Sequence, residues 1–312
     1  MPIENEGYQV TAIKKIVTTI IILCLVGGLL FFGYQAELKL NEYRTALDIH
    51  TKRTLEVRNG RNVDFDKLLS QNGDVKGWIW LPDSNIDYPI VQSEDNEYYL
   101  HRDLDGNYLY DGSIFIDCFN EAPFEDFNTV IYGHRMISGA MFADLKHYAD
   151  QKYMDNHRII QIETPEKSYD LHVVAFCNEL SDSDLYTTNF IEWQMPVSDD
   201  PDYTADDSDI YIPMNREAFV DLVREKAAVL SGEDFDTDDT FVTLSTCVNA
   251  SGDQRIQVIG ILKDAALEEN VSVTKTDKPF INKWLVLQIL VGVLIAAAIV
   301  ATLVPWAKRK RR

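Results

Sequence analysis

The chain has 312 residues and a formal net charge of −21, from 29 Lys and Arg against 50 Asp and Glu. A chain this acidic repels a phosphate backbone, which argues against nucleic-acid binding. With 46% hydrophobic and 25% charged residues it is neither disordered nor fibrous, and its length allows one or two globular domains.

The cysteine pattern indicates neither a zinc site nor a disulfide scaffold. Cys24, Cys118, Cys177 and Cys247 are widely separated, and none lies in a CxxC or Cys/His pattern with ligand spacing. Four cysteines in a chain of this length are too few for a disulfide-dense domain. The sequence therefore predicts no metal and no cofactor.

The first predicted element is a membrane-spanning helix over residues 16–36, after a short N-terminal segment, 1–15. The run is uncharged, and about 20 apolar residues cross the hydrocarbon layer of a bilayer. A cleaved signal peptide is the alternative, but its apolar region would be shorter and a small-residue cleavage site would follow it. The length of the run favours an uncleaved anchor.

A second membrane-spanning helix is predicted over residues 284–307, which are uncharged and have tryptophan near both ends. The alternative is a buried helix of a soluble protein. A basic tail, 308–312, follows the second run, and Lys14 and Lys15 precede the first. By the positive-inside rule both termini are cytoplasmic and residues 37–283 lie outside the cell.

Between the two spans we expect a mainly β domain over residues 76–264, joined to the membrane by stalks at 37–75 and 265–283. The first stalk has a helical pattern with an imperfect apolar stripe. Eight short β-like runs separated by turn residues then indicate a barrel or a sandwich. These runs are Gly77–Leu81, Ile86–Gln92, Gly112–Asp117, Thr129–His134, Arg158–Glu163, Asp170–Cys177, Thr240–Cys247 and Arg255–Lys263.

Two helices are predicted among these strands. Met141–Ala149 carries its apolar residues on one face, and Asn215–Leu230 begins with an asparagine that suits an N-cap. Before the second helix, residues 180–212 are strongly acidic. We interpret them as a solvated loop; a calcium site is the alternative, although the spacing does not fit an EF-hand.

The candidate chemistry lies where three apolar strands end. Cys247 ends one strand, and Arg255 opens the next after seven residues. If these strands are neighbours, a thiol and a permanently charged guanidinium lie close together. A cysteine nucleophile also needs a histidine, and His134 is the best placed because it ends another β-run. The alternative for Cys247 is a small buried hydrophobic residue.

These residues carry a resemblance to a known family. TLSTC (Thr243–Cys247), followed eight residues later by Arg255, resembles the nucleophile motif of sortases, and YGH (Tyr132–His134) resembles their catalytic-histidine motif. The segments IDYPIVQ, DNEYYL and GSIFID are similar to upstream sortase segments in the same order. The resemblance runs from about Gly77 to Lys263 and is strongest to class B.

The resemblance implies an eight-stranded sortase-type β-barrel and a cysteine transpeptidase. Cys247 would be the nucleophile, His134 the general acid/base, and Arg255 would hold the substrate or stabilise the oxyanion. The partners would be secreted proteins with a C-terminal sorting motif and an amine of peptidoglycan. The enzyme would lie in the membrane of a Gram-positive-type bacterium as a two-pass protein.

Further expectations follow from the same resemblance. Ser245, Asn96 and Leu100 are predicted to contact substrate, and Cys118 and Cys177 are expected to be unpaired, with a disulfide between them as the alternative. The predicted C-terminal span is more typical of class C, the pilin polymerases, although no Asp-Pro-aromatic lid segment is found. Pilin polymerisation, a hydrolytic cysteine protease and a catalytically silent surface-binding domain therefore remain alternative functions.

Overall fold

The structure, a computed structural model, describes residues 17–38, 41, 54, 56–59, 62–136, 138–188, 190, 214–247 and 254–265. The chain divides into two compact units. One contains residues 1–45 and 277–312, and the other contains residues 46–276. The predicted span 284–307, its basic tail 308–312 and nearly all of the stalk 265–283 lie outside the described residues.

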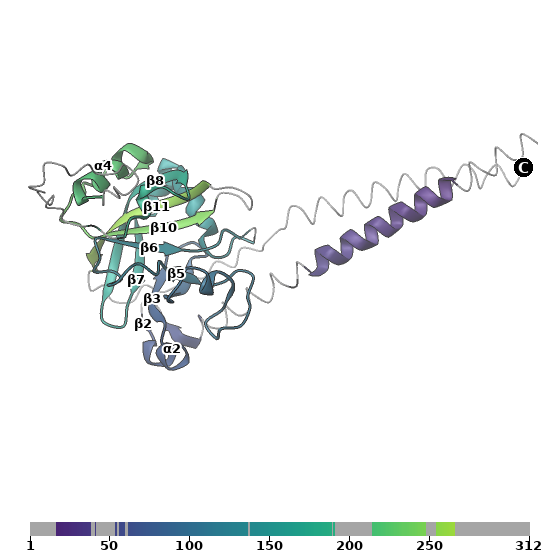
Figure 1. Ribbon diagram of the computed structural model, residues 1–312, viewed down its shortest axis with the longest axis horizontal. Coiled ribbons are helices and arrows are strands. Elements are labelled where there is room, and N and C mark those ends of the chain that lie inside the picture. The colour runs from purple at the N-terminus through teal and green to yellow at the C-terminus, as the bar shows by residue number, and fades with distance from the viewer. Residues whose placement is uncertain are drawn as a thin grey trace, which may run out of the picture. The chain divides into compact units, whose positions relative to one another are not determined.

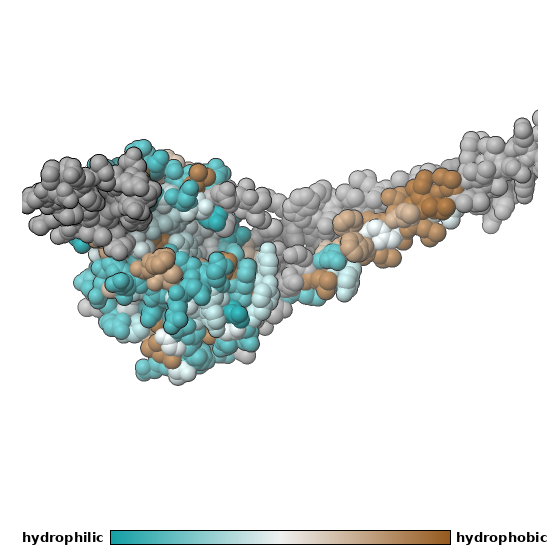
Figure 2. All heavy atoms as spheres, in the orientation of Figure 1, coloured by the Kyte–Doolittle hydropathy of each residue, from teal (hydrophilic) through white to brown (hydrophobic). Residues whose placement is uncertain are grey.

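The first unit contains an apolar helix, Val17–Leu38, at the position predicted for the first span. It has 22 residues, and its most apolar stretch has a mean hydropathy of 2.3. None of that stretch is buried, and Figure 2 shows hydrophobic side chains gathered along it. Among the described residues it is the one helix long and apolar enough to cross a membrane.

The second unit is mainly β (Figure 1). Its strands are β1 (Arg58–Asn59), β2 (Asn62–Val63), β3 (Val75–Trp80), β4 (Asp87–Val91), β5 (Ile114–Ile116), β6 (Asn128–Tyr132), β7 (Ile159–Glu163), β8 (Ser168–Leu180), β9 (Ala227–Leu230), β10 (Phe241–Cys247) and β11 (Gln254–Asp264). Its helices are α2 (Phe65–Gln71), α3 (Gln151–Asn156) and α4 (Arg216–Lys226), with 3₁₀ helices η1 (Tyr98–His101), η2 (Phe142–Ala149) and η3 (Asp184–Tyr186).

Eight of these strands close into a barrel, as the sequence predicted. They follow the order β11-β10-β6-β5-β4-β3-β7-β8, and a long antiparallel pairing of β11 with β8 closes the ring. Figure 1 shows β6, β10, β11 and β8 side by side. Each of the eight predicted β-runs corresponds to one barrel strand, because apolar runs bounded by turn residues mark strands of this kind clearly.

A ninth strand was missed by the sequence analysis. The helix expected over Asn215–Leu230 ends at Lys226, and Ala227–Leu230 instead forms β9, paired with β8. The Asn215 side chain does cap the helix, accepting a hydrogen bond from the Ala218 N–H at 2.8 Å. The last four residues of the predicted helix form a strand instead, because backbone hydrogen bonds to β8 override the local helical pattern.

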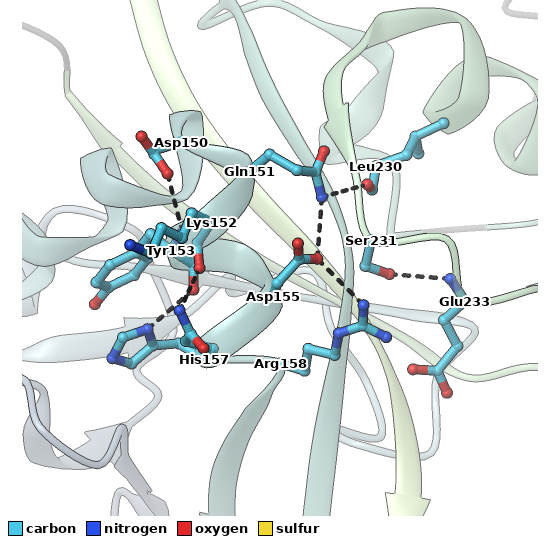
Figure 3. Close-up of polar contacts among 11 residues, drawn as sticks. Asp150, Gln151, Lys152, Tyr153, Asp155, His157, Arg158, Leu230, Ser231 and Glu233 are labelled. Atoms are coloured by element: carbon cyan, nitrogen blue, oxygen red, sulfur yellow. Dashed lines mark hydrogen bonds and ion pairs between the residues drawn. The ribbon is translucent and has the colours of Figure 1, made fainter.

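Strand β9 is also held from outside the sheet. The Gln151 side chain of α3 donates to the Leu230 carbonyl at 3.1 Å and to Asp155 at 3.2 Å, and Arg158 donates to the same carboxylate (Figure 3). This short network fastens the end of β9 to α3. It depends on residues more than 70 positions apart in sequence, which local pattern reading does not detect.

Two further expectations are corrected. The helix predicted over Met141–Ala149 is a 3₁₀ helix that starts at Phe142, although its larger apolar residues, Phe142, Leu145 and Tyr148, are buried as expected. The predicted stalk 37–75 is not a stalk throughout. From Val57 onward it packs against the barrel, since Val57 and Leu68 share a buried cluster with Trp78 of β3.

The other main cluster places α4 against the barrel. Its buried residues Phe219, Val220 and Val223 pack with Phe241 of β10 and with side chains of β8 and β11. Strand β10 is therefore held on its outer side by a helix and along both edges by neighbouring strands. Burial of these large side chains contributes most of the local stability.

Gly133, which follows β6, leaves no room for a side chain. A Cβ there would lie 2.5 Å from Ile114 Cδ1 and 2.7 Å from Phe142 Cδ2. We expect Gly133→Ala to lower the free energy of unfolding by about 1–3 kcal/mol in denaturant titrations, as overpacking usually does. Gly73→Ala is the matched control, because nothing lies within 4 Å of its Cβ position. Equal stability of the two variants would contradict the packing described.

Candidate active site

The backbone register brings the ends of three strands together. Cys247 is paired directly with Arg255 across the antiparallel β10–β11 ladder. On the other edge β10 runs parallel to β6, with Ser245 opposite Tyr132. The Gly133 N–H donates to the Ser245 carbonyl at 3.1 Å, so the chain leading to His134 stays attached to β10. The predicted nucleophile, histidine and arginine therefore converge at one end of the barrel.

The His134 ring is held by a segment 34 residues earlier in the chain. Its Nε2 lies 2.9 Å from the Leu100 carbonyl oxygen, and its ring stacks on His101 with centroids 5.4 Å apart and planes 18° apart. A carbonyl oxygen only accepts, so Nε2 carries the hydrogen in this bond. The neutral ring then keeps its lone pair on Nδ1, which can accept a proton.

Burial lowers the pKa of His134 below its usual value of 6.5. The hydrogen bond to the Leu100 carbonyl opposes this shift, whereas the electrostatic interactions with the His101 ring and with the Arg255 charge add to it. A buried imidazole resists a positive charge because the charged form loses solvation, and the nearby guanidinium disfavours it further. His134 is therefore neutral at neutral pH and able to accept a proton.

Arg255 is half-buried at the start of β11, and its Nη1 donates to the Gln254 carbonyl at 3.4 Å. A guanidinium remains charged at any physiological pH. Because Arg255 is the ladder partner of Cys247, its charge lies beside the end of β10. Such a charge favours a thiolate and a developing oxyanion.

Ser245, predicted to contact substrate, is only 1% exposed. Its hydroxyl lies 2.8 Å from the Tyr186 hydroxyl, which also accepts a hydrogen bond from Gln257 at 2.9 Å. The Tyr186 ring in turn stacks near Tyr132, with centroids 6.0 Å apart. The structure therefore places Tyr186 over Ser245, a residue that the sequence analysis did not single out.

Tyr186 was missed because it lies in the acidic stretch interpreted as a solvated loop. The start of that stretch is in fact ordered against the barrel: η3 spans Asp184–Tyr186, and Leu185 is fully buried. A hydrophobic pair, Leu185-Tyr186, within an otherwise acidic sequence was the available signal. Residues 191–213 lie outside the described residues, so the interpretation of the rest stays a prediction.

Asn96 and Leu100 lie near the site in different ways. The Asn96 side chain donates to Asp117 at 3.1 Å and accepts from the Cys118 N–H at 2.8 Å. Tyr132 donates to the same Asp117 carboxylate at 2.8 Å. Asn96 thus joins a network behind the YGH motif, while Leu100 supplies the carbonyl that holds His134. Contact of either residue with substrate remains a prediction.

The described cysteines outside β10 do not form a disulfide. Cys118 and Cys177 are free thiols. Burial raises the pKa of Cys177 to about 12, and burial together with Asp117 raises the pKa of Cys118. Both are therefore poor sources of thiolate at neutral pH. Within the part of the chain that the structure describes, no three His, Cys, Asp or Glu side chains gather to hold a metal ion.

Comparisons with known proteins agree with this architecture. The family described as "Sortase domain" matches residues 79–263. Sortase B of Listeria monocytogenes is 32% identical over 244 residues, which cover 75% of this chain and 91% of the relative. The crystal structure of B. anthracis sortase B in complex with AAEK1 is 28% identical and has a TM-score of 0.56. The match covers 72% of this chain and 100% of that one.

A third similar protein was solved with a substrate. The Staphylococcus aureus sortase B–substrate complex is 26% identical, with a TM-score of 0.54. The match covers 73% of this chain and 94% of that one. The family match over residues 79–263 includes Cys247, His134 and Arg255.

Because the positive charge of Arg255 lowers the pKa of His134, its removal should raise that pKa. In an NMR titration of ¹³C-labelled histidine, we expect the His134 imidazole to take up its proton at a higher pH in the Arg255→Ala variant than in the parent. His134→Gln assigns the signal, and Arg255→Lys, which keeps the charge, should stay close to the parent. An unchanged or lower pKa in Arg255→Ala would show that the two groups do not interact.

Proposed function

Because the chain belongs to the sortase family, whose members are cysteine transpeptidases, and its similar relatives are of class B, we propose that it anchors secreted proteins to the cell wall. It would cleave a C-terminal sorting motif and pass the acyl group to an amine of peptidoglycan. The observation that carries the proposal is the register of β10, which pairs Cys247 with Arg255 and Ser245 with the strand leading to His134.

In the proposed reaction the Cys247 thiolate attacks the carbonyl carbon of the scissile peptide bond. The tetrahedral oxyanion is stabilised by Arg255, and its collapse breaks the C–N bond. His134, after taking the thiol proton, donates it to the leaving amine. The resulting thioester is attacked by the incoming amine, which forms a new amide and returns Cys247.

The lowered pKa of His134 has a consequence for this scheme. The imidazolium needed to protonate the leaving amine is a minority species at neutral pH. The active ion pair would therefore form in only a fraction of the molecules. Such a pair gives kcat/KM a bell-shaped dependence on pH, and the two apparent pKa values of that curve describe the coupled pair and neither residue alone.

The apolar helix Val17–Leu38 supports anchoring of the enzyme in the membrane. In the proposed topology this helix and the predicted span 284–307 both cross the bilayer, and the catalytic domain lies outside the cell. The substrate in the S. aureus complex belongs to that relative. For this chain we propose the same class of substrate, a secreted protein with a sorting motif.

The predicted C-terminal span supports a second candidate function, polymerisation of pilins. The two functions share the thioester and differ in the amine that resolves it. The same assay separates them, since peptidoglycan-type amines and a pilin lysine can be offered in competition. Preferential transfer to the pilin lysine would replace wall anchoring with pilus assembly.

We expect Cys247→Ala to abolish turnover, and Arg255→Ala to lower kcat/KM about 10²–10³-fold through loss of oxyanion stabilisation. The measurement is mass spectrometry of the full-length chain in detergent with sorting-motif peptides and added amines. The parent should show a thioacyl adduct on Cys247 that is converted to an amide.

Cys118→Ala is the matched control for this experiment. It removes another thiol of the same domain, one whose raised pKa makes it a poor nucleophile. It should retain the adduct and the turnover of the parent. If Cys247→Ala turned over sorting-motif peptides as fast as the parent does, the nucleophile assignment would be wrong.

We expect protease added to intact cells to digest the domain between residues 37 and 283 and to spare an epitope tag placed at the C-terminus. The reason is the basic tail, which holds the C-terminus on the cytoplasmic side. Inverted vesicles are the control and should give the opposite pattern. Digestion of the domain in inverted vesicles alone would overturn the proposed orientation.

A further inference from the structure

A row of aromatic rings leads from His134 to the protein surface. The ring of His101 stacks on His134. Two tyrosine rings in turn lie against His101. The Tyr110 ring centroid is 6.1 Å from that of His101, with the planes 26° apart, and the Tyr108 centroid is 6.1 Å from it, with the planes 37° apart. Tyr108 is 73% exposed and Tyr110 is 43% exposed. We call His101, Tyr108 and Tyr110 the aromatic row.

The core of the barrel does not require these tyrosines to be aromatic. The same segment is anchored in the core by other side chains, namely Tyr99, Leu104 and Leu109, which are buried. Tyr108 instead presents most of its ring to solvent. Tyrosine is a residue that binding surfaces favour, because it offers a large apolar face with a polar tip.

The row is held in place by backbone hydrogen bonds. The Leu109 N–H donates to the His101 carbonyl at 3.1 Å, and His101 Nδ1 lies 3.1 Å from the Tyr110 carbonyl oxygen. At the tip of the turn, one Asp103 carboxylate oxygen accepts from the N–H groups of Asp105 and Asn107. The rings are therefore positioned before a ligand arrives, which lowers the entropic cost of binding.

Charge decides what kind of ligand this surface suits. Residues 95–112 contain five acidic residues and a single basic one, Arg102. Arg102 lies over the Tyr98 ring at 4.9 Å and donates to the Gly106 carbonyl. A negatively charged segment that displays aromatic faces attracts cations, both through the net charge and through cation–π interactions.

Groups of two kinds lie near His134. Arg255, the ladder partner of Cys247, is a cation beside the end of β10 and suits the carbonyl oxygen of the acyl donor. The ring stacked on His134 is His101, where the aromatic row begins within the acidic segment. A transpeptidase needs a site for each of two substrates, one that becomes an oxyanion and one that arrives as an ammonium group.

We propose that the aromatic row is the binding site for the acceptor substrate, a peptide with a protonated primary amine, and that it directs this amine to His134. The inference rests on the proposed transpeptidase function. The bound ammonium gives one proton to His134, and the free amine attacks the thioester carbonyl. A C–N bond forms, the C–S bond breaks, and the second amine proton passes to the departing Cys247 sulfur; His134 releases its proton to water.

The test separates acceptor binding from acyl-enzyme formation. For Tyr108→Ala, and for the double variant Tyr108→Ala/Tyr110→Ala, steady-state kinetics are measured with a sorting-motif peptide and triglycine as acceptor. We expect the KM for triglycine to rise about 5- to 30-fold in the double variant, from the loss of two cation–π contacts at an exposed site. The KM for the sorting-motif peptide and the rate of hydrolysis without acceptor should not change.

Two controls make the result specific. Tyr108→Phe/Tyr110→Phe keeps the rings and should behave like the parent. Hydroxylamine, a small nucleophile that cannot span the row, should resolve the thioester of parent and double variant equally well. An unchanged KM for triglycine in the double variant, or a rise in the KM for the sorting-motif peptide instead, would overturn the proposal.

A binding measurement keeps the proposal independent of turnover. Saturation-transfer difference NMR of triglycine with the full-length Cys247→Ala chain detects acceptor contact without any reaction. We expect transfer to the peptide from aromatic protons, lost in a chain that also carries Tyr108→Ala/Tyr110→Ala. Binding in this assay with no thioester in the parent would refute the transpeptidase function alone, whereas a thioester without such binding would refute the acceptor site alone.

Discussion

Strand β10 is paired along both edges, and the rest of the candidate site depends on that double pairing. Its parallel register with β6 sets the position of His134, and its antiparallel register with β11 sets the position of Arg255. A shift by one residue on either edge would turn every side chain of the strand to the opposite face. The site is therefore specified by backbone hydrogen bonds and by the packing of α4 on the barrel.

Around this strand two sets of polar side chains form hydrogen bonds with one another. Tyr186 forms hydrogen bonds with Ser245 and Gln257, and the Asp117 carboxylate accepts hydrogen bonds from Asn96 and Tyr132. Burial raises the pKa of Tyr132, with the Asp117 carboxylate adding to the effect, so the phenol stays protonated and can donate. Networks of this kind are costly when incomplete, and they hold a single arrangement of the site when complete.

Much of this could be predicted from the sequence, for identifiable reasons. The eight barrel strands contain apolar runs separated by turn residues, so each one is visible in a local window. The convergence of Cys247, His134 and Arg255 follows from strand ends and from the resemblance to sortases. By contrast, β9 exists because β8 pairs with it, and the Leu100 carbonyl meets His134 across 34 positions of sequence. Such non-local contacts leave no periodic signal.

The contacts of individual side chains were also hard to predict from their residue type and position in the sequence. Ser245 and Asn96 suited substrate contact by position, yet the structure engages both in hydrogen bonds within the protein. Tyr186, hidden in an acidic stretch, lies over Ser245. The tilted and stacked rings beside His134 were equally invisible, because His101 and the two tyrosines meet through the fold of a turn and carry no motif.

The short strand β9 has a consequence for a protein held at a membrane surface. Closed barrels leave no unpaired strand edge, but β9 is added to the sheet and, among the described residues, pairs along one edge alone, with β8. The strand is only four residues long, and Gln151 occupies the carbonyl of Leu230 at its end. Tethered molecules meet one another at high local concentration, where a longer free edge would template strand-to-strand aggregation. The brevity of β9 thus acts as a safeguard for molecules crowded in two dimensions.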